Sequence, residues 1–287
     1  MDKNKEQIIT SGLYLVSTPI GNLGDITNRA LKVLQTSDVI LCEDTRRSVK
    51  LFSHFKIKGK LLAYHKYNEK KMSNEIISLI KKNKIISLIS DAGTPAISDP
   101  GVVIINKCIE EGIDIHPVPG ASAVTSAISV SGFKDKYLFY GFLPKKKNEI
   151  KSIFNNLSKL DLTLVFFIPI SKINFYLSDF KRYFNDRKIV IAKEMTKIHE
   201  KFIRGNVFQV NSLVDNFSDQ ELKGEFTVVL SGKNKQKNIT NEINDSIKLE
   251  IKKMLKKYSH KDVVDFISKK EDLPKKIVYD FCLKLKK

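Results

Sequence analysis

The amino-acid sequence predicts an α/β protein with two α/β domains and a small helical module at its carboxyl end. Apolar segments of strand length alternate with segments whose apolar residues recur at helical spacing, and α/β proteins typically show this alternation. In the first 140 residues, the strand-like segments are Leu13–Val16, Val39–Cys42, Leu61–Tyr64, Ile85–Ile89, Ile113–Val118 and Tyr137–Tyr140. The amphipathic segments between them include Ile26–Leu34, Met72–Lys82 and Ala121–Ser131. This order predicts a mostly parallel sheet with helices on its faces.

A second set of strand-like segments predicts a second α/β domain. A lysine-rich connection, residues 144–151, leads into it. The expected strands lie near Leu162–Ile168, Ile189–Ala192, Phe202–Arg204 and Phe226–Leu230.

The last part of the chain predicts a linker and three short helices. Residues 232–244 are polar and rich in Lys and Asn, as linkers are. The expected helices are Ile247–Lys256, Lys261–Lys269 and Lys275–Leu285, and Ser259 with Asp262 resembles a capping pair at the start of the second. The predicted divisions are therefore a first domain at 12–143, a second at 144–232, a linker at 233–245 and a helical module at 246–287.

Length and composition indicate a globular protein of about two domains. The chain has 287 residues, 42% of them hydrophobic and 29% charged. No apolar segment approaches the ~20 residues of a membrane-spanning helix, and the polar residues 1–12 lack the apolar core of a signal peptide, so we expect a cytoplasmic protein. Cys42, Cys108 and Cys282 are too far apart for a disulfide framework or a thiolate zinc site, so we expect them to be buried and expect no metal.

The net charge of +18 has two explanations. A polyanionic partner is one. The other is a genome-wide bias towards A- and T-rich codons, because Lys, Ile and Asn are abundant and Arg is scarce. Local clusters favour a partner: Lys145–Lys147 is one, and the last 55 residues hold 16 lysines against 8 acids.

The segment Ser90–Gly101 is the strongest candidate for a ligand site. It follows an apolar strand and precedes an apolar helix, at the carboxyl edge where open α/β sheets bind their ligands. Gly93 and Gly101 allow close approach to the backbone, and Pro95 and Pro100 stiffen the loop. A tight turn with ordinary turn residues is the alternative.

Three other loops carry candidate ligand groups. Ser17–Thr27 follows the first strand with a G-x-x-G pattern, and neither the dinucleotide pattern nor the phosphate-binding P-loop pattern occurs in the chain. Glu43–Arg47 places two acids beside two arginines, which can bind phosphate or simply form ion pairs. Pro117–Ala123 opens a helix whose first N–H groups can receive an anion.

These loops, in this order, closely resemble the tetrapyrrole-methylase superfamily of S-adenosylmethionine-dependent methyltransferases. Within it, the chain is similar to the ribosomal RNA small-subunit methyltransferase I family. The matching segments are Thr18–Thr27, Glu43–Arg46, Ser90–Gly101, Pro119–Ser122, Gly141–Pro144 and Ala192–Lys197. The resemblance spans essentially the whole chain, including the carboxyl-terminal module.

The resemblance implies a homodimer that binds S-adenosylmethionine in a cleft between two α/β domains and methylates the ribose 2′-oxygen of cytidine 1402 in 16S rRNA of the small ribosomal subunit. The cofactor residues that it implies are Pro19, Gly21, Asn22, Asp91, Ala92, Gly93, Thr94, Pro95, Ser98, Asp99, Pro100, Gly101, Pro119, Gly120, Ala121, Ser122, Ala192 and Leu230. One segment departs from the family. Where many relatives carry an acid and a histidine, this chain reads Phe167-Ile168-Pro169-Ile170-Ser171-Lys172, so no mechanism that needs those two groups carries over.

Methyl transfer to a ribose hydroxyl is an in-line displacement that also needs a proton acceptor. The candidate bases are Asp25, Asp44 and His65, with Asp44 favoured because Arg46 and its neighbour Arg47 could bring an RNA phosphate to it. The same arginines would lower its basicity. For each of these residues a structural role, as an ion pair or an edge-of-sheet hydrogen bond, is the alternative.

Two other functions remain open at this stage. A methyltransferase acting on a porphyrin or cobalamin precursor would use the same fold and cofactor, but it has no need of the basic charge or the carboxyl-terminal helices. A noncatalytic ribosome-binding relative would fit the altered segment at Phe167–Lys172, whereas the cofactor loops argue against it.

Overall fold

The computed structural model describes residues 8–209, 224–233, 243, 245–271 and 273–285. The chain divides into two compact units, Met1–Lys233 and Asn234–Lys287. Among the described residues, the first unit contains two five-stranded sheets and the second contains three helices.

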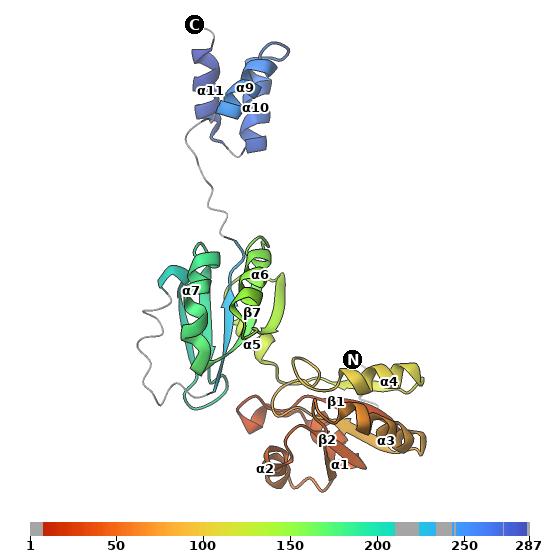
Figure 1. Cartoon of the computed structure of the whole chain (residues 1–287). Coiled ribbons are helices and arrows are strands. Elements are labelled where there is room, and N and C mark those ends of the chain that lie inside the picture. Colours follow the sequence, from red (N-terminus) through yellow and green to blue (C-terminus); the bar gives the residue numbers. More distant parts are fainter. Residues whose placement is uncertain (1–7, 210–223, 234–242, 244, 272, 286–287) are drawn as a thin grey trace. The chain divides into compact units, whose positions relative to one another are not determined.

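The first sheet is entirely parallel, with the strand order β3-β2-β4-β1-β5. Its strands are β1 (Gly12–Val16), β2 (Val39–Cys42), β3 (Lys60–Ala63), β4 (Ile85–Leu88) and β5 (Ile115–Val118). The helices around it are α1 (Asn28–Thr36), α2 (Thr45–Phe55), α3 (Glu69–Lys81) and α4 (Val102–Glu110) (Figure 1). Apolar residues of α1 and α2 pack on one face and those of α3 and α4 on the other, which confirms the predicted α/β arrangement.

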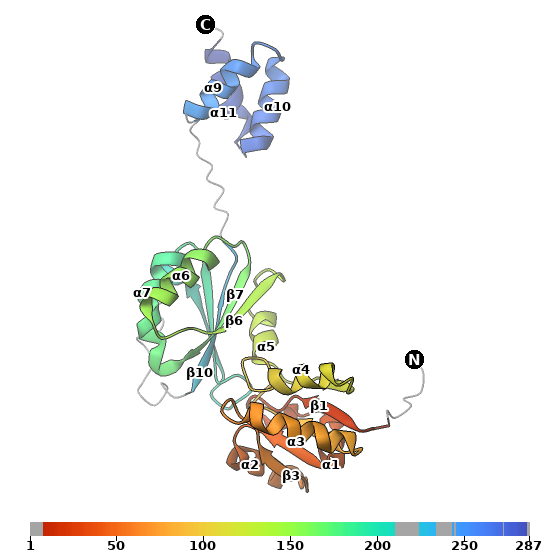
Figure 2. The same cartoon turned by 45° about the vertical axis from the view of Figure 1, so that its right-hand side comes forward.

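The second sheet is mixed, with the order β6-β7-β10-β8-β9. Its strands are β6 (Tyr137–Phe142), β7 (Thr163–Pro169), β8 (Lys188–Lys193), β9 (Lys201–Asn206) and β10 (Glu225–Leu230). Only the β6–β7 pair is parallel. Helices α6 (Lys147–Leu157) and α7 (Ile173–Phe184) cover one face, and α5 (Ala123–Ser129) packs on the other (Figure 2).

Two local expectations differ from this structure. The segment at Tyr137 was expected in the first sheet, but it pairs with β7 in the second, because apolar periodicity identifies a strand without identifying its partner. The lysine-rich connection at 144–151 is not all connection, since α6 begins at Lys147. The buried Ile150 turns one face of this helix to the core while its lysines remain exposed.

A buried arginine holds together the end of the second sheet that lies away from the first. The side chain of Arg187 is 1% exposed, and its guanidinium donates hydrogen bonds to five backbone carbonyl groups. The acceptors are Leu157, Ser158, Leu160, Leu162 and Ser231, at 2.6–3.4 Å. The guanidinium also lies 5.2 Å from the centre of the Phe184 ring. One side chain thus satisfies the carbonyl groups of the loop between α6 and β7 and of the end of β10.

The second unit contains α9 (Asp245–Met254), α10 (His260–Glu271) and α11 (Lys275–Lys284) around a small apolar core. The Ser259 hydroxyl accepts a hydrogen bond from the Asp262 backbone N–H at 3.3 Å and donates one to its carboxylate at 2.7 Å, which confirms the predicted capping pair. Within the described ranges, no helix is long and apolar enough to span a membrane. All three cysteines are buried, as expected.

Replacing Arg187 by alanine should leave several buried carbonyl groups without a hydrogen-bond donor. We expect Arg187→Ala to lower the free energy of unfolding by about 3–5 kcal/mol. Urea denaturation followed by circular dichroism would measure the change. The exposed Arg182→Ala is the matched control and should change stability by less than about 0.5 kcal/mol; equal stability of the two variants would contradict the role given to Arg187.

Candidate active site

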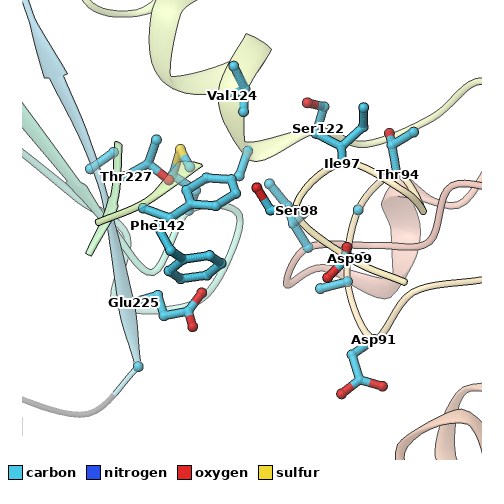
Figure 3. Close-up of a pocket in the computed structure, with 18 of the residues that line it drawn as sticks. Asp91, Thr94, Ile97, Ser98, Asp99, Ser122, Val124, Phe142, Glu225 and Thr227 are labelled. Atoms are coloured by element: carbon cyan, nitrogen blue, oxygen red, sulfur yellow. The ribbon is translucent and has the colours of Figure 1, made fainter. Parts of the chain in front are cut away.

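The loops after β1, β2 and β4 and the start of α5 meet one edge of the second sheet around a cavity of about 670 Å³, here called the cleft cavity. Figure 3 shows Ser98 and Asp99 on one side of it, with Phe142 and Glu225 on the other. The ends of β6, β7 and β8 and the start of β10 all reach this edge, because β10 runs antiparallel to β7 and β8. The volume lies in the range of small-molecule sites.

The Ser90–Gly101 loop is tied to the loop after β1. Thr18 and Gly93 exchange both backbone hydrogen bonds, at 2.9 and 3.0 Å, and the Thr18 hydroxyl donates to the Ser90 carbonyl at 3.2 Å. Ala96 and Ser98 have φ angles of 64° and 66°, a left-handed conformation that is costly for residues with a Cβ. Surrounding contacts therefore hold this loop in a shape that it would not adopt alone.

The second sheet supplies the apolar side of the cavity. Phe142 and Phe167 line it with their ring centres 5.4 Å apart, together with Pro169 and Ala192. The segment that departs from the family, beginning at Phe167, is therefore part of the cavity wall. Aromatic rings at this position offer a stacking surface for a flat ligand group.

The loop after β8 in the second sheet contacts the loop after β1 in the first. The Asn22 backbone N–H donates to the Thr196 hydroxyl at 2.9 Å. A Cβ on Gly21 would lie 2.7 Å from the Met195 carbonyl oxygen and 2.6 Å from the Thr196 hydroxyl, so only glycine fits. Met195 itself lines the cleft cavity.

Five acids line the cleft cavity: Glu43, Asp91, Asp99, Glu194 and Glu225. Of these, Glu194 pairs with Lys197, which also lines the cavity, at 3.0 Å. Burial, with a smaller contribution from Glu43 and Asp91, raises the pKa of Asp99 to about 7. Burial also raises the pKa of Glu43 and that of Glu225. The one ion pair with an arginine at this wall, among the described residues, joins Arg47 Nη1 to Asp91 Oδ2 at 3.0 Å. The cavity is therefore suited to a cationic ligand.

Asp44 has a different environment. It caps α2, accepting a hydrogen bond from the Arg46 backbone N–H at 2.9 Å, and its carboxylate pairs with the Arg46 guanidinium at 2.8 Å. These hydrogen bonds lower the pKa of Asp44 to about 2. An acid held so strongly in its ionised form is a weak proton acceptor at neutral pH.

The four residues predicted as catalytic do not line the cleft cavity. They are Asp25, Asp44, Arg46 and His65. Asp25 ends an exposed 3₁₀ turn, Leu23–Asp25. His65 lies close enough to Glu43 to influence its pKa, and its buried Nδ1 has no hydrogen-bond partner among the described residues.

The predicted cofactor residues fall into three groups. Those that line the cleft cavity are Asp91, Ala92, Gly93, Thr94, Ser98, Asp99, Ser122 and Ala192. Pro19 and Gly21 line a smaller cavity of about 250 Å³ beside α2, which Ala92 and Asp91 also line. The third group lines neither cavity: Asn22, Pro95, Pro100, Gly101, Pro119, Gly120, Ala121 and Leu230. Leu230 is fully buried in the core under α6 and α7, at the opposite end of β10 from Glu225.

Ile20, within the segment 19–22 expected at the rim of the site, lines the cavity, whereas Phe142, Glu225 and Thr227 line it without having been predicted. Arg47 lines the cavity although Arg46 was the predicted catalytic arginine. One signal was available in the sequence, since Glu225 is an acid directly before an apolar strand. The others become neighbours of the loops only when the second sheet packs against the first.

A two-lobed α/β protein with a ligand cavity at the carboxyl edge of its parallel sheet is the class that this fold and site define. The chain belongs to the family Tetrapyrrole (Corrin/Porphyrin) Methylases, whose sequence model matches residues 12–211.

Similar proteins named "Ribosomal RNA small subunit methyltransferase I" extend this comparison. The protein of Thermotoga maritima is 46% identical over 77% of this chain and 98% of its own length. That of Rickettsia prowazekii is 39% identical over 92% of this chain and 99% of its own, and that of Neisseria meningitidis serogroup B is 33% identical over 100% and 98%.

Solved structures share the fold at low sequence identity. The methyltransferase CobJ has a TM-score of 0.58 at 13% identity, covering 77% of this chain and 94% of its own. Cobalt precorrin-4 methyltransferase has a TM-score of 0.55 at 18% identity, covering 76% and 94%. At this identity the likeness concerns the fold alone.

Neutralising Asp99 should stabilise the protein at alkaline pH. Because the pKa of Asp99 is raised in the folded state, its contribution to stability is complete below pH 3.8 and is lost as pH rises through about 7. Allowing for the solvent contact of this half-buried group, we expect Asp99→Asn to gain roughly 1–2 kcal/mol over the parent between pH 5 and pH 8.

Urea denaturation of both proteins at the two pH values measures this gain. The exposed Asp114→Asn controls for the loss of a carboxylate as such. If the difference in free energy of unfolding between Asp99→Asn and the parent were the same at both pH values, the raised pKa would be contradicted.

Proposed function

We propose that this chain transfers the methyl group of S-adenosylmethionine to a ribose 2′-oxygen of small-subunit ribosomal RNA, with cytidine 1402 of 16S rRNA as the target nucleotide. The observation that carries the proposal is the similarity, at 33–46% identity over 77–100% of the chain, to relatives named for this class of activity. The enzyme is then a transferase whose cofactor is S-adenosylmethionine.

The cleft cavity supports this cofactor. S-adenosylmethionine carries a sulfonium, an ammonium and a carboxylate, and its net positive charge suits a wall that contains Asp91, Asp99 and Glu225. The rings of Phe142 and Phe167 offer a surface for the adenine. In this proposal the Asp91–Thr94 and Ser98–Asp99 backbone, with Ser122, contacts the rest of the molecule. The other predicted cofactor residues shape the loops that present these groups.

The reaction requires little of the protein beyond positioning. A carbon–oxygen bond forms as the carbon–sulfur bond breaks, the hydroxyl proton passes to an acceptor, and the sulfonium becomes a neutral thioether. The low pKa of Asp44 makes it a weak acceptor for this proton. We therefore assign two other roles to this pair. Asp44 caps the start of α2 and orients the exposed Arg46 guanidinium, and Arg46 binds an RNA phosphate.

The basic surface supports an RNA partner. The chain has 50 Lys and Arg against 32 Asp and Glu, although the cleft cavity is lined by acids. We assign the lysine-rich helices α9, α10 and α11 to ribosomal RNA contact, through phosphates. A homodimer and a cytoplasmic location, where ribosomal subunits are assembled, complete the proposal.

Methylation of a tetrapyrrole precursor is the second candidate. The structures that are named for such substrates share 13–18% identity with this chain, which supports the fold and not the substrate. The basic helical unit favours RNA instead. A noncatalytic ribosome-binding protein would not need the cleft cavity, so cofactor binding separates it from both enzymes.

Labelled methyl transfer tests the proposed function directly. The purified chain is incubated with labelled S-adenosylmethionine and small ribosomal subunits that lack native modifications. We expect a 2′-O-methyl group at the target cytidine, mapped by nuclease digestion and mass spectrometry. Cofactor binding without transfer to subunits would count against the RNA substrate, and transfer to a tetrapyrrole precursor would establish the second candidate.

Cofactor affinity should depend on pH through Asp99. Because the pKa of Asp99 is about 7, its carboxylate is mostly protonated at pH 6 and mostly ionised at pH 8. We expect the Kd of the cationic cofactor to fall about fivefold over this interval, since the ionised form attracts it. Calorimetric titration measures it, and Asp99→Asn should abolish the fall. A fall of equal size in that variant would assign it to another group.

A further inference from the structure

The smaller cavity beside α2, here called the α2 cavity, shares a wall with the cleft cavity. It has a volume of about 250 Å³ and lies among the loop after β1, the first turns of α2 and the end of β4. Ile20, Arg47, Asp91 and Ala92 line both cavities. The Thr18–Gly93 backbone bridge ties together the two loops that carry Ile20, Asp91 and Ala92, and so fixes the shared wall.

The geometry points to the α2 cavity as the subsite for the ribose and phosphate of the RNA nucleotide that receives the methyl group. This inference rests on the proposed function and adds to it where the acceptor binds. A displacement reaction needs donor and acceptor in contact at one point. The two cavities share the lining residues Ile20, Arg47, Asp91 and Ala92, so an acceptor in the smaller one lies next to a cofactor in the larger one.

The size of the α2 cavity suits part of a nucleotide. Its volume lies below the range of about 300–1,000 Å³ for sites that enclose a whole drug-sized ligand, whereas the cleft cavity lies within that range. A single nucleotide drawn out of its stack would place its sugar in this space and leave its neighbours outside.

The chemistry of the α2 cavity matches a sugar–phosphate. Arg47 and Lys50, one turn apart on α2, both line it, and their side chains reach solvent. Arg47 already pairs with Asp91 through Nη1, but a guanidinium has five N–H groups and can bind a phosphate at the same time. Lys50 makes no ion pair with another described residue.

The remaining lining suits the rest of the nucleoside. The side chains of Ile20, Leu23 and Leu51 are apolar, and those of Ser48 and Ser90 carry hydroxyl groups. The apolar side chains can pack against the ribose carbons. The Ser48 and Ser90 hydroxyls already donate to backbone carbonyl groups, so they can act only as acceptors towards a ribose hydroxyl. By contrast, the acids other than Asp91 line only the cleft cavity, so a phosphate here avoids most of the negative charge.

Three substitutions at two positions test the subsite in the full-length protein with unmodified small subunits as substrate. We expect Lys50→Glu to raise the KM for subunits at least about tenfold, and Lys50→Ala to reduce the slope of log KM against log salt by about one. Leu23→Trp, on an exposed turn that tolerates a larger side chain, should fill the cavity and lower kcat/KM for subunits about 100-fold. The Kd of S-adenosylmethionine should stay within twofold in all three.

Lys60→Glu is the matched control, because Lys60 is an exposed lysine at the amino-terminal end of β3, on the opposite edge of the same sheet. Its KM for subunits should stay within twofold of the parent. If Lys50→Glu and Lys60→Glu raised the KM equally, the effect would come from the net charge of the protein and not from a contact at Lys50. That result would overturn the subsite. So would unchanged kcat/KM in Leu23→Trp. Absence of transfer by the parent chain would instead overturn the proposed function.

Discussion

The backbone bridge between Thr18 and Gly93 is the constraint on which the site depends. Neighbouring parallel strands β1 and β4 end side by side, and this antiparallel bridge joins the loops that follow them. Because the loops are joined, Ile20, Asp91 and Ala92, which line both cavities, are held in one arrangement. The left-handed residues Ala96 and Ser98 lie further along the second of these loops. Because β2 lies beside β4 in the sheet, α2 begins next to these loops, and its Arg47 lines both cavities.

Charge is distributed unevenly in this chain, and the distribution fits two ligands of opposite sign. The protein as a whole carries a net charge of +18, yet five acids line the cleft cavity. The loss of water around Asp99 and, to a smaller extent, the neighbouring acids Glu43 and Asp91 make its charged form unfavourable, which is why its pKa is raised. A cation in the cleft would relieve that cost, while the surface lysines attract a polyanion over longer distances.

The second sheet provides the rest of the binding surface through its strand directions. Because β10 runs against β7 and β8, Glu225 and Thr227 at its start reach the same edge as Phe167 and Ala192. At the other end of the sheet, Arg187 satisfies the carbonyl groups of the chain ends. The residues that line the cavity therefore lie at one edge of this sheet, and the hydrogen bonds of Arg187 that stabilise the sheet lie at the opposite edge.

The sequence by itself determined the α/β class, nearly all of the strands and the identity of the Ser90–Gly101 loop, because apolar periodicity and loop chemistry are local properties of the chain. The tertiary structure alone decided which sheet holds Tyr137, and that Arg47 lines the cavity where Arg46 does not. Adjacent residues on a helix point about 100° apart, so their spacing in sequence could not choose between them. The site forms through pairing between distant strands and through packing of one sheet on the other. Local sequence patterns do not encode these long-range contacts.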